Sequence, residues 1–384
     1  MHINYIKEVL RINQVYVDNS ATTKISKQVL EKMMPYLKEN YGNASQEYSL
    51  GKISKEAIEN SRKKIANLIG AKPKEIYFTT SGTQADNLAI LGLARANKNK
   101  GNHIITSTIE HKAILNSTKE LEREGFNVTY LPVDNYGKID IISLKNAIRS
   151  DTILISIMLV NNEIGTIQDI TEIKKIAKEN NIISHTDATQ AAPHMKLDSS
   201  YCDAMTFSAH KFQGPKGIGV LYLKSGIAIE NISYGGSQEN GLIPGTENVA
   251  NIVGMAEAFE NTQKNIEGIN KKEKVLYNYL LSKLKKIPGF VLNGTEKGSI
   301  DSIINFYISG IDTKNLMLYL ELNGICISSG SACNTKSQEL SHVQKAIGNN
   351  YPSIRISLNY QNTLDEMDYI YENIIKCINI FHNK

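Results

Sequence analysis

A lysine and an aspartate mark the part of the chain where chemistry is expected. Lys211 stands in a loop of small residues directly after the apolar run 204–207. Asp187 ends the run 182–186 and lies 24 positions before Lys211, which leaves room for a strand, a connection and a second strand. A lysine amine can form a Schiff base, and a carboxylate can keep a pyridine nitrogen protonated. An enzyme that uses pyridoxal 5′-phosphate (PLP) needs such a pair.

A single pair of this kind decides little, because a surface lysine and a helix-capping aspartate are common in any protein. The hypothesis therefore depends on what gathers around the two residues. In open α/β sheets ligands bind at the carboxyl ends of the strands, so polar residues that follow an apolar run are the candidates.

Two segments suit a phosphate group. Thr83 ends the sequence Thr80-Ser81-Gly82-Thr83, which follows the expected strand 75–79 and opens a helix, and Thr246 lies in a similar position before the helix expected from residue 247. Backbone N–H groups and hydroxyls at a helix N-terminus bind anions. An ordinary N-cap explains either segment as well.

A histidine and an asparagine follow two further expected strands. His111 comes after the strand 103–107 and can stack on a planar ring or move protons. Asn162 comes after the strand 152–158 and can bond a ring hydroxyl or a substrate carboxylate. A surface histidine and a polar turn remain the alternatives.

Cys333 and Arg355 are the candidates in the last third of the chain. Cys333 ends the small-residue segment 328–333, where an exposed thiolate is placed to act as a nucleophile, although an incidental thiol is also possible. Arg355 is a charge in the apolar strand 353–358, and its partner is either a substrate carboxylate or a structural carboxylate. The other cysteines fit small core positions: Cys202, Cys326 and Cys377.

Short apolar runs alternate with amphipathic segments through the first 223 residues, which predicts a mostly parallel sheet covered by helices on both faces. The expected strands are 75–79, 103–107, 127–131, 152–158, 182–186, 204–208 and 217–223. The expected helices are 53–69, 84–96, 111–124, 140–149 and 170–180.

After about residue 247 the pattern changes to two long helices and a few short strands. The helices are expected at 247–264, 271–286, 313–323 and 364–380, and the strands at 289–292, 302–308 and 353–358. This indicates a smaller α+β domain. We expect a large domain over 15–260 and a small one over 261–384, with residues 1–14 packed on the small domain.

The composition excludes several classes of protein. The chain has 384 residues, a net charge of only +4 and no dense basic block, which argues against direct nucleic-acid binding. No apolar run approaches the ~18 residues that a membrane span needs. The four cysteines show no CxxC spacing, so we expect neither a metal site nor a disulfide framework. These features predict a cytoplasmic protein with reduced thiols.

Taken together and in this order, the candidate residues resemble those of cysteine desulfurases of the NifS/IscS type, which belong to the class V aminotransferase family of fold-type I PLP enzymes. The resemblance runs from about Val15 to about Tyr369. It rests on several motifs: Asp18-Asn19-Ser20-Ala21-Thr22-Thr23, Glu110-His111-Lys112, Asn161-Asn162-Glu163-Ile164-Gly165, Asp187-Ala188-Thr189-Gln190, Ser208-Ala209-His210-Lys211 and Ser328 to Cys333.

The resemblance implies a role for each site residue. The residues that it assigns to PLP are Lys211 for the covalent aldimine, Asp187 for the pyridine nitrogen, Gln190 and Asn162 for the ring substituents, His111 for stacking and proton transfer, and Thr83, Ser208 and His210 for the phosphate. Thr246 would reach the phosphate from the other subunit of a homodimer. Asn162 and Arg355 would hold the substrate carboxylate, and Cys333 would take the sulfur as a persulfide.

The implied reaction removes sulfur from L-cysteine, releases L-alanine and passes the sulfur to an acceptor protein in iron–sulfur cluster assembly or tRNA thiolation. A selenocysteine lyase or another class V PLP enzyme is an alternative. A third is a PLP-binding partner of a sulfur-assembly complex with weakened catalysis, because Ile243 stands where the family usually has an arginine.

Overall fold

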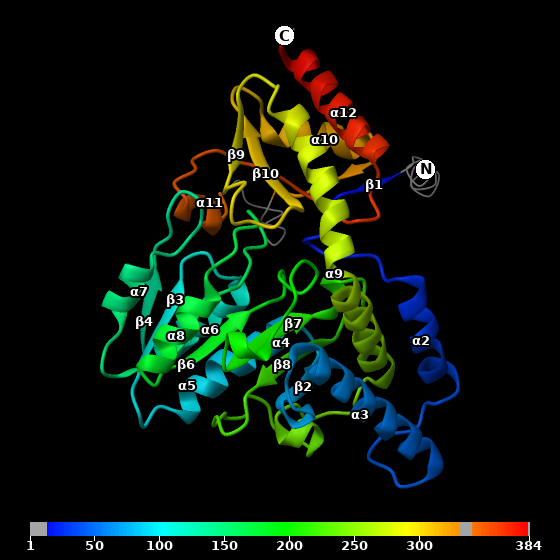
Figure 1. Cartoon of the computed structure of the whole chain (residues 1–384), viewed down its shortest axis with the longest axis vertical. Coiled ribbons are helices and arrows are strands. Elements are labelled where there is room, and N and C mark those ends of the chain that lie inside the picture. Colours follow the sequence, from blue (N-terminus) through cyan, green and yellow to red (C-terminus); the bar gives the residue numbers. More distant parts are fainter. Residues whose placement is uncertain (1–13, 330–339, 383–384) are drawn as a thin grey trace.

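The computed structural model describes residues 14–329 and 340–382, and its largest sheet has the strand order β2-β8-β7-β6-β5-β3-β4 (Figure 1). The strands are β2 (Ile76–Thr79), β3 (His103–Ser107), β4 (Asn127–Leu131), β5 (Thr152–Ser156), β6 (Ile183–Asp187), β7 (Ala204–Ser208) and β8 (Gly219–Leu223). β8 runs antiparallel to both of its neighbours, and the other pairs are parallel. The predicted α/β fold with a mostly parallel sheet is confirmed.

Helices cover both faces of this sheet. Successive residues of a strand point to opposite faces, so neighbouring apolar residues of one strand can pack against different sets of helices. In β3, Ile105 belongs to one hydrophobic cluster and its neighbour Ile104 to another. The helices packed into the first cluster are α2 (Lys27–Lys38), α3 (Ser49–Ile69), α7 (Ile141–Ala147), α8 (Ile170–Glu179) and the first part of α9 (Val249–Leu284). Those packed into the second are α4 (Gly82–Asn87), α5 (Leu93–Ala96) and α6 (Lys112–Arg123).

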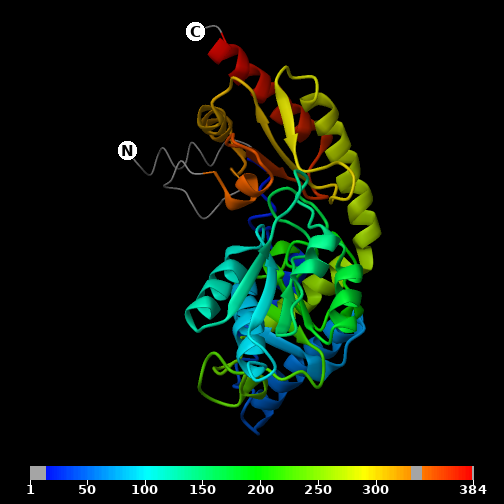
Figure 2. The same cartoon turned by 90° about the vertical axis from the view of Figure 1, so that its left-hand side faces the viewer.

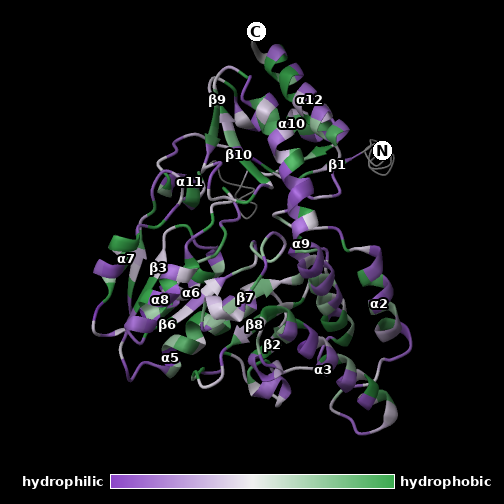
Figure 3. Ribbon diagram, viewed as in Figure 1, coloured by the Kyte–Doolittle hydropathy of each residue, from purple (hydrophilic) through white to green (hydrophobic). Residues whose placement is uncertain are grey.

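The outer helices bury only one side. α3 buries Ile58, Ile65 and Ile69, whose spacing brings them to one face of a helix. Figure 3 shows hydrophilic and hydrophobic residues alternating along α2 and α3, as expected of helices that lie between the core and the solvent. The short helix α7 (Ile141–Ala147) begins at Asp140, whose carboxylate accepts from the N–H groups of Ile142 and Ser143.

A second group of elements lies above the large sheet in Figure 1. Its antiparallel sheet has the order β12-β10-β9, and a separate pair joins β1 to β11 in parallel. The elements are β1 (Val15–Tyr16), β9 (Phe290–Asn293), β10 (Ile303–Ile308), α10 (Thr313–Leu322), β11 (Ile325–Cys326), α11 (His342–Ala346), β12 (Ile354–Ser357) and α12 (Leu364–His382). Their shared cluster includes Val15, Phe306 and Ile356, so the residues just before the large-sheet part of the chain pack with the end of the chain.

One helix runs along both parts. The prediction of two helices at 247–264 and 271–286 is wrong, because α9 continues without a break for 36 residues (Figure 2). Between the two predicted helices, Ile266 and Ile269 are buried and continue the apolar face of the helix. Gly268 in the same segment destabilises a helix by only about 1 kcal/mol. The expected domain boundary at residue 260 falls inside α9. We propose that the large sheet and the β12-β10-β9 sheet are the cores of two domains that α9 connects.

A partly buried histidine links the two groups of elements. His194 follows β6, its Nδ1 lies 2.8 Å from Glu273 Oε2 in α9, and its Nε2 lies 3.2 Å from Ser302 Oγ beside β10. The contacts therefore join the large sheet, the helix and the small sheet at one point. Within the described part of the chain, no helix is both long and apolar enough to cross a membrane.

Candidate active site

A cavity of about 700 Å³ lies at the carboxyl ends of the large-sheet strands, and Arg355 of β12 and residues around α11 also line it. The predicted site residues that line it are Thr83, His111, Asn162, Asp187, Gln190, Ser208, His210, Lys211 and Arg355. Thr246 lies outside this cavity and is exposed in the single chain. Cys333 lies outside the described residues. The structure thus brings together the candidates from the ends of five strands and from β12.

Lys211 is held at the cavity wall by the turn that follows β1. It ends a short 3₁₀ turn after β7, and its Nζ donates to the carbonyl oxygens of Ser20 at 2.5 Å and Ala21 at 2.8 Å. These two carbonyl oxygens hold the amine in the cavity. A lysine amine in such a place can form a Schiff base with a carbonyl compound.

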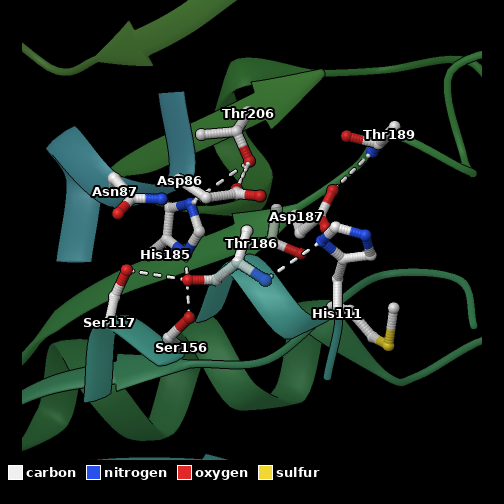
Figure 4. Close-up of polar contacts among 12 residues, drawn as sticks. Asp86, Asn87, His111, Ser117, Ser156, His185, Thr186, Asp187, Thr189 and Thr206 are labelled. Atoms are coloured by element: carbon white, nitrogen blue, oxygen red, sulfur yellow. Dashed lines mark hydrogen bonds and ion pairs between the residues drawn. The ribbon is translucent and has the colours of Figure 1, made fainter. Parts of the chain in front are cut away.

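Asp187 ends β6 and is buried beside two other titratable side chains (Figure 4). Its Oδ1 accepts from the N–H group of Thr189 at 2.8 Å. The nearest polar atoms of Asp86, His111 and Asp187 all lie within 4.8 Å of one another. His111 caps α6, and its Nδ1 accepts from the N–H group of Ala113 at 3.2 Å. Burial lowers the pKa of His111 although Asp187 opposes the effect, so the ring is neutral with its proton on Nε2.

Neutral donors and acceptors from the ends of β2 and β7 also line the cavity. Ser208 ends β7, and its hydroxyl donates to the Ile218 carbonyl at 3.2 Å. His210 Nδ1 lies 3.1 Å from Thr22 Oγ1, and burial together with the charges of Lys211 and Lys216 lowers the pKa of His210 to about 4. Gly82 opens α4 here, where a Cβ atom would lie 3.3 Å from Ser208 Cβ. The glycine keeps this end open to a ligand.

Gln190 lines the cavity with a buried amide. Its Nε2 donates to Ser20 Oγ at 3.4 Å, whereas its Oε1 has no hydrogen-bond partner among the described residues. An orphaned buried acceptor is costly, and the cavity is the place from which a partner can come.

Arg355 is fully buried in the middle of β12 and reaches toward the large sheet. Its Nη2 donates to Asp18 Oδ1 at 2.8 Å, and its Nη1 donates to the carbonyl of Asn162 at 2.9 Å. One of the partners of Arg355 is therefore a structural carboxylate, which is one of the two alternatives given by the sequence. The side chain lines the cavity as well, so the same guanidinium connects Asp18, the Asn162 loop and the ligand space.

The comparisons with known proteins agree with this geometry. The family profile Aminotransferase class-V matches residues 15–370. The chain belongs to the class V aminotransferase family. It is 48% identical over 375 residues to cysteine desulfurase IscS of Methanosarcina thermophila, covering 96% of this chain and 93% of that protein, and 45% identical over 369 residues to the IscS of Dictyoglomus turgidum, covering 93% and 92%.

Solved structures of class V relatives share the fold. A NifS-like protein superposes with a TM-score of 0.90 at 34% identity, covering 96% of this chain and all of that one. SspA in complex with cysteine superposes with a TM-score of 0.81 at 34% identity, covering 91% and 99%. The chain therefore has the fold-type I architecture that the resemblance implies.

The sequence reasoning gave no role to several residues of this class V site. Glu110 is fully buried, its Oε1 accepts from Ser107 Oγ at 2.6 Å and from the N–H of Met158 at 3.1 Å, and burial raises its pKa to about 8. His342 Nε2 donates to the Glu110 carbonyl at 2.8 Å. A glutamate directly before a candidate histidine was the available signal for Glu110. His342 lies outside the candidate motifs, and the sequence gave no signal for it.

Glu163, Ser341 and Asp86 were also missed. Ser341 Oγ donates to Glu163 Oε2 at 2.6 Å, and both residues line the cavity. Asp86 lies in the second turn of the helix that begins at Gly82, between Ala85 and Asn87, and the local sequence gave no signal of its surroundings. Ile243, which stands for the usual arginine, is buried in the second hydrophobic cluster and does not line the cavity of its own chain.

Proposed function

We propose that this protein is a PLP-dependent cysteine desulfurase that converts L-cysteine to L-alanine and holds the sulfur as a persulfide on Cys333. The observation that carries the proposal is the meeting in one cavity of the Lys211 amine, the Asp187 carboxylate and the Arg355 guanidinium. These are the groups that a Schiff base, a pyridine nitrogen and an amino-acid carboxylate require. The curated relatives named as cysteine desulfurases support the choice of substrate.

The residues present fit PLP. Lys211 Nζ offers the amine, and Asp187 offers a buried carboxylate for the ring nitrogen. The buried Oε1 of Gln190 gains a partner when the cavity is filled. Thr83, Ser208 and His210 supply hydroxyls and an imidazole for the phosphate end, and we propose that Thr246 joins them from the other subunit of a homodimer. When bound, PLP supplies an electron sink for negative charge at the substrate α-carbon.

The side chains around the substrate position have separate tasks. Arg355 pairs with the substrate carboxylate while Asp18 and the Asn162 carbonyl keep its guanidinium in place. Asn162 offers its side-chain amide to the same carboxylate. His111 carries its proton on Nε2 and lies beside Asp187, so it can pass protons inside the cavity.

Sulfur transfer needs a nucleophile that approaches the substrate from outside the large sheet. The Cys333 thiolate attacks the substrate sulfur and forms an S–S bond while the substrate C–S bond breaks. The electron pair of the broken bond stays with the substrate carbon, which takes up a proton and leaves as alanine. The ends of the Cys333 segment are well fixed: Ser328 exchanges two backbone hydrogen bonds with Arg355, and Ser341 bonds to Glu163.

The product sulfur must leave the enzyme. We infer that an acceptor protein takes it from Cys333 for iron–sulfur cluster assembly or tRNA thiolation, and that this occurs in the cytoplasm. Cys202, Cys326 and Cys377 are free thiols, and burial raises the pKa of each, so none competes with Cys333 as a thiolate.

The test is production of alanine and sulfide from L-cysteine with a reductant by the wild type, Lys211→Ala, Cys333→Ser and the control Cys326→Ser. We expect Lys211→Ala to lose activity and the covalent fixation of PLP by borohydride. Cys333→Ser should keep the PLP spectrum and lose almost all sulfide production. Cys326→Ser should retain sulfide production. Activity on selenocysteine alone, or PLP binding without turnover, would favour a lyase or a non-catalytic partner instead.

A further inference from the structure

Asp86 is a second acidic group beside Asp187. It projects from α4 toward the junction of β6 and β7, and only 1% of its surface is exposed. Thr206 Oγ1 donates to Asp86 Oδ1 at 2.5 Å, and Thr206 pairs directly with Asp187 across the two strands (Figure 4). The two carboxyl groups therefore lie together at the floor of the cavity, which both residues line.

No described side chain gives Asp86 a positive partner. His185 Nε2 lies 4.0 Å from Asp86 Oδ1, but burial lowers the pKa of His185 to about 3, so this ring is neutral. Its Nδ1 is 2.9 Å from the hydroxyl of Ser156. Glu110 is acidic, His111 is neutral, and the Lys211 amine is bonded to the carbonyls of Ser20 and Ala21.

Two carboxyl groups this close in a buried place do not both ionise. Asp187 accepts an N–H group from Thr189 and lines the cavity. Asp86 accepts one hydroxyl hydrogen bond from the described residues, that of Thr206, and burial and the charge of Asp187 raise its pKa well above the ordinary value. The proton of the pair therefore belongs on Asp86.

We propose that Asp86 is a positioning residue that stays protonated at neutral pH, so that the Asp86–Asp187 pair presents a single negative charge to the cofactor nitrogen. One negative charge matches one pyridinium nitrogen. The role toward the cofactor rests on the proposed function, whereas the protonation of Asp86 does not.

Infrared spectroscopy of the cofactor-free protein tests the protonation state directly. A protonated carboxyl group absorbs apart from a carboxylate, and aspartate labelled with ¹³C at the side-chain carboxyl shifts its band while leaving that of Glu110 unshifted. We expect the labelled wild type at pH 7 to show a protonated aspartate band that is absent from Asp86→Asn and present in the control Glu110→Gln. A labelled wild type without such a band overturns the proposal, and this outcome needs no variant to fold.

The cofactor-bound protein gives a second readout. Asparagine replaces a protonated aspartate without a change of charge, so Asp86→Asn should move the pH midpoint of the visible PLP absorbance by less than about half a unit. Loss of an ionised neighbour would move it by about two units, which would contradict a neutral Asp86. Asp187→Asn is the matched control and should weaken PLP binding strongly. If the wild type does not bind PLP, the proposed function fails while the infrared result still stands.

Discussion

The floor and the outer wall of the cavity are built in different ways. The floor consists of residues at the ends of neighbouring parallel strands and in the helix that follows β2, and contacts such as Thr189–Asp187 and Thr206–Asp86 stay within the large-sheet part of the chain. The outer wall consists of residues near β12 and α11 whose partners are distant: Arg355 bonds to Asp18 across 337 positions, and His342 bonds to Glu110 across 232. The floor depends on one sheet, whereas the wall depends on how two sheets meet.

The largest expected effect is at Arg355. Arg355→Ala removes the guanidinium that joins Asp18 to the Asn162 carbonyl, and it leaves a buried acceptor and a carboxylate without this donor. Breaking such a pair costs about 3–5 kcal/mol, so we expect a loss of that size in the free energy of unfolding measured with urea. The activity for L-cysteine should fall with it.

The matched control for Arg355→Ala is Arg149→Ala. Arg149 also makes a two-point contact with a carboxylate, that of Asp151, but half of its side chain is exposed, and such pairs contribute about 0–1 kcal/mol. Equal losses for the two variants would show that the distant contacts of the wall carry no special weight.

The difference between floor and outer wall explains which site residues could be predicted from the sequence together with their neighbours. Asp187, His111 and Lys211 were expected at one edge of the sheet because the carboxyl ends of parallel strands meet there, and all three line the cavity. Arg355 was recognised as a charge in an apolar strand, but its partner Asp18 was not, since no local pattern encodes a pairing between opposite ends of the chain.

The sequence did not predict the full length of α9 or the buried position of Asp86, and the reasons differ between the two. Gly268 and the polar residues between 264 and 271 are compatible with a break in the helix, and the burial of Ile266 and Ile269 goes with its continuation through this segment. Asp86 was overlooked because a carboxylate in a short helix has many possible surroundings, and its closeness to Asp187 follows from the packing of α4 on β7.

The next effect is a pH dependence of stability that arises from Glu110, which lies where the floor and the outer wall of the cavity meet. Glu110 has a pKa of about 8 in the folded protein against an ordinary value of 4.5. Between these values the folded state holds a proton that the unfolded state has released, so stability falls as the pH rises, by at most about 1.4 kcal/mol per pH unit. Glu110→Gln removes this contribution and should gain stability relative to the wild type from pH 5 to pH 8.

The measurement is thermal unfolding of both proteins at one-unit steps of pH. The exposed Glu47 is a suitable control, because Glu47→Gln should leave the wild-type dependence unchanged. Parallel curves for the wild type and Glu110→Gln would mean that Glu110 is ionised in the folded protein despite its burial.

The smallest effect concerns Ser341, which makes two hydrogen bonds in the outer wall of the cavity. Its Oγ accepts from the Gln344 N–H as the cap of α11 and donates to Glu163 Oε2 at 2.6 Å. Ser26 caps α2 and has no such carboxylate partner among the residues that the structure describes, so Ser26→Ala measures a cap alone, about 1 kcal/mol. We expect Ser341→Ala to cost about 2 kcal/mol, because a buried carboxyl group loses a hydrogen bond in addition.

A double-mutant cycle of Ser341→Ala with Glu163→Gln isolates the contact between the two residues. If the hydroxyl and the carboxyl act together, their urea-unfolding energies should be non-additive by about 1 kcal/mol, whereas Ser26→Ala with Glu163→Gln should be additive because the two sites share no partner. Additivity in both cycles would mean that α11 is held by its cap and its apolar packing alone. The outer wall would then depend on Arg355 rather than on a set of long-range hydrogen bonds.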